Sequence, residues 1–386
     1  MAVPGNETIR ALAASARERQ IVPLTWVAAT REQDYVNLGD ALSAVMVSLL
    51  SGLPVEHVAH ESRRLRMAAV GTIGHSLKEG EVVVWGTGSS RWRNPSAPAE
   101  ERVAVAPLPG TRLHIAATRG PVSRRILGGA DAAGPAVYGD PVWLLPQFYP
   151  GPTRKKWKLG VIIHLADLQD RSFDVRPKAE HIRYQVPAEL AGEVKLIHTV
   201  TPIGLDGMRA RLDEILECER IVSTSLHGMV FAESYGIPCL YFSPRAPRGL
   251  HMMELDPDGT LDLRIVDLYR GLGRGHIPVY GQPRRERTDW AALMAAIDTA
   301  WMQPRFDPAP LLEAFPLDLN PLRPRDGETV FDHPVLRQIP LQHRPQTVIR
   351  PAAASVAARP AAVARPTPGP LQRMAALLRR PLTNRA

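Results

Sequence analysis

Short apolar runs alternate with longer segments of helical periodicity along the first 300 residues. The apolar runs predict strands at residues 22–29, 81–85, 112–117, 159–164, 194–198, 221–223 and 238–242. Apolar residues at helical spacing predict helices at 40–50, 121–127, 205–218, 226–235 and 289–301. Because Gly and Pro bound these segments and the alternation recurs in both halves, we expect an α/β fold with largely parallel strands.

The segment 149–158 (YPGPTRKKWK) combines Pro and Gly with four basic residues, as interdomain linkers do. We therefore expect a first domain at 1–152, a second at 153–305 and an extension at 306–340. From residue 341 onward, seven prolines among many Ala and Arg residues predict a disordered tail, because such a segment buries too little apolar surface to offset its ordering entropy. The stretch 371–380 would suit contact with an anionic membrane surface, although a solvated tail is the favoured interpretation.

Charge separates the tail from the body of the protein. Lys and Arg number 47 against 39 Asp and Glu, a formal charge of +8 in 386 residues. Residues 341–386 contain eight Arg and no acidic residue, so the other 340 residues balance to zero. A balanced body argues against a nucleic-acid-binding protein. Two cysteines, no secretory signal at the start and no long apolar run predict a soluble protein of a reducing, cytoplasmic compartment.

The most informative segment is 221–243, which is expected to form a strand, a turn, a helix and a second strand. The turn lies at the carboxyl end of a parallel strand, where α/β sheets bind ligands, and the amides that open the helix favour an anion. His227 in that first turn would either transfer protons and contact an anion, or serve as a structural histidine bonded to a carbonyl group. A hydrolase pair of Ser225 and His227 is disfavoured, because residues two apart on a helix do not face each other.

Two segments of the first half are also expected at ligand-facing turns. Asn37-Leu-Gly39-Asp40 opens an apolar helix, in which Asp40 either caps the helix, the favoured interpretation, or presents its carboxylate to a ligand. The strand at 81–85 leads into a turn that contains Gly86 and Gly88, whose backbone a ligand could approach closely. A third glycine and a following helix are missing, so an NAD site is poorly supported.

Three further polar side chains follow strands. Arg119 is expected at a carboxyl edge, where it would either grip a carboxylate or phosphate or remain a solvated surface arginine. His164 and Asp167 place an imidazole and a carboxylate three residues apart at the end of another strand. His57 and His60 lack a third ligand, so we predict no metal site.

Taken in order, these segments resemble the polysaccharide pyruvyl transferase family. The resemblance is carried by the segments 37–40, 85–89, 119–123, 139–146 and 160–167, by Ser223-Thr-Ser-Leu-His-Gly228 with Ala232 and 235–238, and by Asp267-Leu-Tyr269. It covers about residues 22 to 270, and its weight comes from seven segments in the right order.

The resemblance implies two Rossmann-like domains that face each other across a cleft, similar to the GT-B arrangement of glycosyltransferases. It also implies transfer of the enolpyruvyl unit of phosphoenolpyruvate to two hydroxyls of one sugar in an exopolysaccharide or other cell-surface glycan, with release of phosphate and without a cofactor. The acceptor would be a free sugar or a lipid-linked oligosaccharide, and the basic tail would allow peripheral contact with the inner membrane. The first domain would hold the acceptor and the second the donor.

The implied roles fall on residues already singled out. His227 is the expected acid or phosphate contact, and Asp40 is the expected base for the acceptor hydroxyls. Donor-binding residues are expected at Arg119, Ser225, Leu226, His227 and Gly228, and further candidates at the cleft are Asn37, Gly39, Gly86, Gly88, His164, Asp167 and Asp267.

Two alternatives compete with this interpretation. A GT-B-type glycosyltransferase would use the same architecture with a nucleotide sugar, since fold does not fix function. A non-catalytic scaffold that engages glycan, membrane or nucleic acid through its tail would lose its function when residues 341–386 are deleted, whereas the enzyme would lose little activity on a soluble acceptor.

Overall fold

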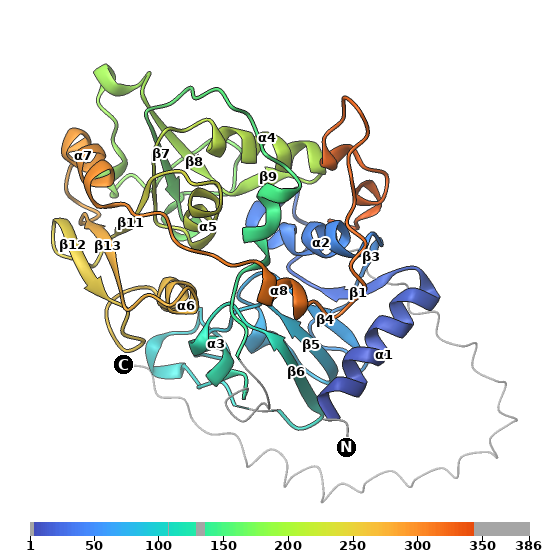
Figure 1. The fold of residues 1–386 in the computed structure, drawn as a ribbon. Helices are drawn as coiled ribbons and strands as arrows, with labels where there is room; N and C mark the ends of the chain where they lie inside the picture. The colour runs from blue at the N-terminus through green and yellow to red at the C-terminus, as the bar shows by residue number, and fades with distance from the viewer. Residues whose placement is uncertain (1–3, 107, 129–135, 343–386) are drawn as a thin grey trace, which may run out of the picture. The chain divides into compact units, whose positions relative to one another are not determined.

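The computed structural model describes residues 4–106, 108–128 and 136–342, and all of them belong to one compact unit (Figure 1). The predicted tail from residue 343 onward, with its stretch 371–380, lies outside the described residues. The prediction of a disordered tail is wrong for residues 341 and 342, which belong to the folded body. Leu341 is buried, and its carbonyl oxygen accepts a hydrogen bond from the amide of Ala29 at 2.9 Å.

The first half of the chain forms a five-stranded sheet in which all neighbouring strands are parallel. Its order is β3 (Val55–His57), β1 (Val22–Thr25), β4 (Arg66–Ala68), β5 (Gly80–Trp85) and β6 (Thr111–Ala117). The chain moves from β1 to β3 on one side and then to β4 on the other, so the connections diverge between β1 and β4. Such a switch point is where parallel sheets bind ligands, at the carboxyl ends of the strands.

The second half forms a six-stranded sheet. Its order is β12 (Gly249–Glu254), β13 (His276–Gly281), β11 (Cys239–Ser243), β10 (Ile221–Ser223), β7 (Leu159–Ile163) and β8 (Val194–His198), with only β12 antiparallel. The switch point of this sheet falls between β7 and β10. The predicted α/β class with parallel sheets is confirmed.

The five predicted helices are present, and each of their ends lies within two residues of its predicted position. They are α2 (Leu38–Ser51), α3 (Pro121–Ile126), α4 (Leu205–Leu216), α5 (Leu226–Ser234) and α7 (Trp290–Ala300). The sequence did not predict α1 (Pro4–Arg19), α6 (Leu263–Gly271) or α8 (Ala309–Glu313). Helix α1 is polar on average, and among its residues 7–19 only Leu12 and Ala16 are buried, so its apolar periodicity is weak. Among the helices of the described residues, none has the length and apolar character needed to cross a membrane.

The start of α2 is fixed against the second half of the chain. Strand β2 (Tyr35–Asn37) pairs antiparallel with β9 (Val200–Pro202), and the amide of Leu38 donates to the carbonyl of Thr199 at 2.7 Å. Nearly every residue of α2 is buried, which explains why its sequence is apolar on all sides. This pairing brings the segment 37–40 to the second sheet.

A buried ion pair makes the second connection between the halves. Asp267 of α6 pairs with Arg119 at 3.0 Å, and each side chain is 1% exposed. Asp267 also accepts hydrogen bonds from the amides of Val122 and Ser123, the first amides of α3, both at 2.9 Å. At Gly120, a Cβ atom would lie 1.8 Å from the backbone oxygen of Asp267, so only glycine permits this approach.

The chain returns to the first sheet after α7, along the orange segment of Figure 1. The backbone oxygen of Leu311 in α8 accepts the indole N–H of Trp85 at 2.9 Å. Farther along, the amide of Asn320 donates to the carbonyl of Leu50 at 2.8 Å. The segment after α7 thus packs on elements of the first half.

We expect Asp267→Ala to lower the free energy of unfolding by about 3–5 kcal/mol, because it leaves the buried charge of Arg119 unpaired. Urea denaturation measures this change. The matched control is Asp318→Ala, which breaks an exposed ion pair with Arg17 and should cost less than about 1 kcal/mol. Equal losses in the two variants would contradict a structural role for the buried pair.

Candidate functional site

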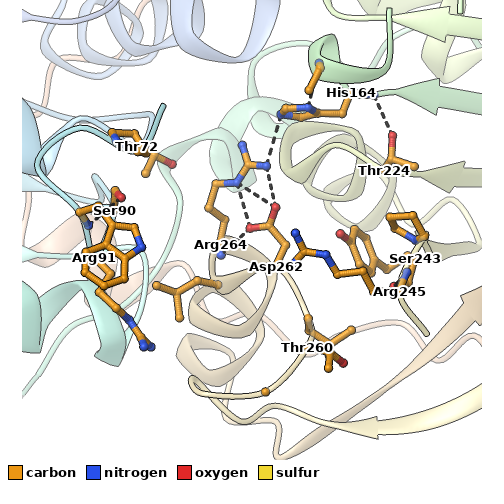
Figure 2. Close-up of a pocket in the computed structure, with 18 of the residues that line it drawn as sticks. Thr72, Ser90, Arg91, His164, Thr224, Ser243, Arg245, Thr260, Asp262 and Arg264 are labelled. Atoms are coloured by element: carbon orange, nitrogen blue, oxygen red, sulfur yellow. Dashed lines mark hydrogen bonds and ion pairs between the residues drawn. The ribbon is translucent and has the colours of Figure 1, made fainter. Parts of the chain in front are cut away.

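A pocket of about 790 Å³ lies where the carboxyl ends of the strands of both sheets meet. The first sheet contributes Thr72, which follows β4, and the second contributes His164 after β7 and Thr224 after β10. Figure 2 shows residues of the first half on one side of the pocket and Thr224 on the other. The pocket therefore adjoins the switch points of both sheets.

The lining of the pocket is rich in arginine. Its charged residues are four arginines and two aspartates, a net of two positive charges with the histidines neutral; they are Arg91, Arg245, Arg264, Arg284, Asp167 and Asp262. A concave site with a positive excess attracts and retains anionic ligands. Among the described residues, no group of three or more His, Cys, Asp or Glu side chains could hold a metal ion.

Arg264 lies at the centre of the pocket, between its two sides (Figure 2). Its Nε donates to Asp262 Oδ1 at 3.0 Å and its Nη2 donates to Asp262 Oδ2 at 2.7 Å, so the carboxylate holds the guanidinium in a fixed plane. Asp262 also caps α6, because its Oδ1 accepts the amide N–H of Arg264 at 2.9 Å. Burial alone would raise the pKa of Asp262, but the charge and hydrogen bonds of Arg264 hold it at about 2.

The other three arginines differ in how they are held. Arg91, from the first half, donates to Asp258 at 2.8 Å and to the backbone oxygen of Pro257 at 2.7 Å, which ties the two sides of the pocket together. Arg284 pairs with Asp167 at 3.2 Å. Arg245 is exposed and has no ion-pair partner within the described part of the chain.

His227 lies in the first turn of α5, as predicted, but it is 8% exposed and does not line the pocket. Its ring faces the backbone of α2, where a Cβ on Gly39 would lie 2.1 Å from Nδ1. Burial, together with the charges of Arg119 and Arg264, lowers the pKa of His227 to about 3, so its imidazole is neutral at pH 7. Its Nε2 has no hydrogen-bond partner among the described residues, which gives no support to a structural histidine bonded to a carbonyl group.

Asp40 lies half-buried in the first turn of α2. The interpretation of Asp40 as the helix cap is wrong, because Asn37 is the cap and its Oδ1 accepts the amide of Gly39 at 3.2 Å. Burial raises the pKa of Asp40 to about 6, with Arg264 opposing the shift and Asp140 adding to it. The Gly39 contact brings the helix of Asp40 to His227, and the charge of Arg264 acts on both side chains.

Arg119 is turned away from the pocket toward Asp267 and lies behind the wall formed by Thr72, to whose hydroxyl it donates at 2.8 Å. Its guanidinium occupies the space beside Gly88, where a Cβ would lie 2.2 Å from Cζ. Gly86 adopts a φ of 86° next to Pro141. The predicted candidates Arg119, Gly88 and Asp267 are therefore brought together, but as part of the buried framework behind the pocket.

In the turn before α5, the residue that lines the pocket is Thr224, and not one of the residues predicted from the sequence. Ser225 is the N-cap residue without a side-chain capping bond, and its amide donates to Ser223 Oγ at 2.9 Å. Leu226 and Gly228 are buried in the helix. Thr224 is the residue of this turn that lines the pocket, and its hydroxyl accepts the amide of His164 at 2.8 Å.

His164 and Asp167 both line the pocket but have different partners. The Nε2 atom of His164 lies 3.3 Å from Nη2 of Arg264. Asp167 accepts from the hydroxyl of Tyr184 at 2.6 Å. Burial alone would raise the pKa of Asp167, but that hydrogen bond and the charge of Arg284 lower it.

Sequence reasoning missed all four arginines of the pocket lining, Arg264 above all. Two patterns point to it: an Asp, Leu, Arg sequence at 262–264 that matches a helix cap, and apolar residues at 265, 266, 268 and 269 that match a helix. Neither pattern shows that Arg264 turns toward a pocket. Arg91, Arg245 and Arg284 lie in loops that carry no motif.

Comparison with known proteins gives one match. The model of the polysaccharide pyruvyl transferase family matches residues 76–245, which include Arg119, His164, Asp167 and His227. Asp40, Asp262 and Arg264 lie outside the matched range. The searches of curated proteins and of solved structures found no match.

We expect Gly39→Ala to lower the free energy of unfolding by about 1–3 kcal/mol, because the added methyl group would lie 2.1 Å from the buried ring of His227. Urea denaturation measures the loss. Gly192→Ala is the matched control, since its methyl group meets nothing within 4 Å, and it should change the free energy by less than about 1 kcal/mol. A Gly39→Ala variant as stable as this control would refute the close contact between α2 and His227.

Proposed function

We propose that this chain, whose residues 76–245 match the model of the polysaccharide pyruvyl transferase family, transfers pyruvate as a cyclic ketal from phosphoenolpyruvate to two hydroxyls of one sugar. The family supports a pyruvyl transferase enzyme with a polysaccharide acceptor. The donor, the ketal product and the placement of the acceptor in an exopolysaccharide or another cell-surface glycan are parts of the proposal.

The arginine-lined pocket is the observation that carries this proposal. Phosphoenolpyruvate has a phosphate and a carboxylate, and the lining offers an excess of positive charge for both groups. Ligand pockets commonly measure about 300–1,000 Å³. At about 790 Å³, this one has room for the three-carbon donor and part of a saccharide beside it.

The reaction proceeds in two balanced steps. A proton adds to the methylene carbon of phosphoenolpyruvate, and one sugar hydroxyl forms a C–O bond to the neighbouring carbon as it loses its own proton. The second hydroxyl then loses its proton and forms a C–O bond to the same carbon, while the bond between that carbon and the bridging oxygen breaks and phosphate leaves with that oxygen. The site must supply an acid, a base and stabilisation of the leaving phosphate.

His227 and Asp40 are the proposed acid and base; neither lines the pocket, but the charge of Arg264, which does, acts on both. The pKa of Asp40, raised by burial to about 6, leaves most of the carboxyl ionised at pH 7 and able to accept a proton from a hydroxyl group. His227 is neutral in the empty site because of burial and of two nearby arginines. A bound anion would offset those charges and raise the pKa of His227, so donor binding itself would prepare the imidazole to carry a proton.

The arrangement of the chain enters the proposal as well. We take the first Rossmann-like domain, residues 1–152, as the acceptor side and the second, residues 153–305, as the donor side of a GT-B-like pair. The enzyme would act in the cytoplasm without a cofactor. Its basic tail would contact the cytoplasmic membrane face, where a lipid-linked acceptor would be found.

The activity test is phosphate release from phosphoenolpyruvate with a panel of bacterial oligosaccharides, followed by mass spectrometry of the acceptor. We expect one oligosaccharide to gain pyruvic acid minus one water, and His227→Ala to reduce the rate about 100-fold or more, because general acid catalysis normally supplies that much. His276→Ala, at an exposed histidine, is the control and should keep the wild-type rate. Transfer from a nucleotide sugar in place of phosphoenolpyruvate would instead identify a glycosyltransferase.

The raised pKa of Asp40 predicts a pH dependence of kcat at saturating phosphoenolpyruvate, where the bound anion has already raised the pKa of His227. A general base must be ionised, so the rate should rise as the pH increases through about 6 and level off above it. Asp40→Asn should abolish this acidic limb and lower the plateau about 100-fold or more. If Asp40→Asn keeps the wild-type rate and profile, Asp40 is not the base.

A further inference from the structure

Arg264 and His164 meet in the pocket with their hydrogen-bond donors directed at each other. The two side chains come from different elements, α6 and the end of β7, and their nitrogens Nη2 and Nε2 lie 3.3 Å apart (Figure 2). Both residues line the pocket.

The tautomer of His164 follows from its other ring nitrogen. Nδ1 accepts the amide N–H of Ala166 at 3.1 Å, so the proton of the neutral ring resides on Nε2. Burial, with the charge of Arg264 acting in the same direction, lowers the pKa of His164 to about 4, which keeps the ring neutral at pH 7. Nε2 is therefore an N–H donor, and it faces a guanidinium that has only donors.

Some N–H groups of Arg264 are not bonded to Asp262. Asp262 takes its Nε and one N–H of Nη2. Within the described chain, no group accepts a hydrogen bond from its Nη1. The charge of Arg264 acts on His227, in the first turn of α5. Helix α5 itself contains no Lys or Arg. Arg264 thus brings positive charge toward His227 from a different helix.

We propose that Arg264 and His164 together bind an oxyanion of phosphoenolpyruvate, its phosphate or its carboxylate, with Asp262 holding the guanidinium in place. This inference rests on the proposed function. An anionic oxygen between the two side chains accepts from Nε2 of His164 and from Nη2 of Arg264, and so turns two opposed donors into a pair of charge-assisted hydrogen bonds. The charge of the same Arg264 acts on the pKa values of His227 and Asp40.

Calorimetric titration of the full chain with phosphoenolpyruvate, inorganic phosphate and pyruvate tests the proposal. Arg264→Gln should weaken phosphoenolpyruvate binding about tenfold or more, because it removes a charged hydrogen-bond donor. Arg264→Lys keeps the charge without the bidentate contact to Asp262 and should fall between Arg264→Gln and the wild type. The ligand that loses affinity, phosphate or pyruvate, identifies which oxyanion the pair holds.

The His164→Asn variant removes the proposed contact with the ligand and keeps the hydrogen bond that holds the local structure. The Asn oxygen can still accept the amide of Ala166, whereas the donor at Nε2 is gone, so the variant should fold normally and bind phosphoenolpyruvate several-fold more weakly. The matched controls are Arg270→Gln, an exposed arginine of the same helix outside the pocket, and His276→Ala. Both should bind as the wild type does, and thermal unfolding checks that every variant is folded.

The outcomes distinguish this inference from the proposed function. If the wild type binds phosphoenolpyruvate and folded Arg264→Gln and His164→Asn bind it equally well, the oxyanion pair is refuted and the function stands. If the wild type binds phosphate through the pair but no phosphoenolpyruvate, the pair stands and the proposed function fails. If it binds neither ligand, both are overturned.

Discussion

The buried ion pair between Arg119 and Asp267 is the interaction on which the site depends. It joins the end of β6 to α6, and Asp267 at the same time accepts the first amides of α3. Charges buried this deeply are tolerated only when they are paired and hydrogen-bonded, so the pair fixes how α3 and α6 meet. Because Arg264 is on the same helix as Asp267, this contact also sets where the central arginine of the pocket lies.

The charges of arginines within and behind the pocket also act on the pKa values of the proposed acid and base. Two arginines, Arg119 behind the pocket and Arg264 within it, lower the pKa of His227 in addition to the effect of burial. Burial raises the pKa of Asp40 into the range of a useful base, against the opposing charge of Arg264. In a site with a neutral histidine and excess positive charge, a bound anion offsets part of that charge and raises the pKa of the histidine. Under the proposed function, Arg264 would therefore couple donor binding to proton transfer.

Local patterns predicted the strands and helices near the site better than they predicted its lining. The turn that contains His227 was predicted because a strand, a cap position and a helix with a Gly end follow each other in the sequence. Strands β4 and β9, of three residues each, were not predicted, and neither were β12 and β13, of six residues each. The role of Asp40 as a cap was predicted wrongly, because Asn37 is also a good cap and stands at the position where the helix actually begins.

The sequence by itself determined the α/β class, five of the helices and a set of polar residues at strand ends, because each of these depends on the spacing of neighbours along the chain. The tertiary structure decided which of those residues face a ligand. It buried His227 against Gly39, turned Arg119 toward Asp267 and placed Arg264 in the pocket beside His164. Contacts between residues about 100 or more positions apart leave no periodic trace in a single sequence, so only the fold could reveal them.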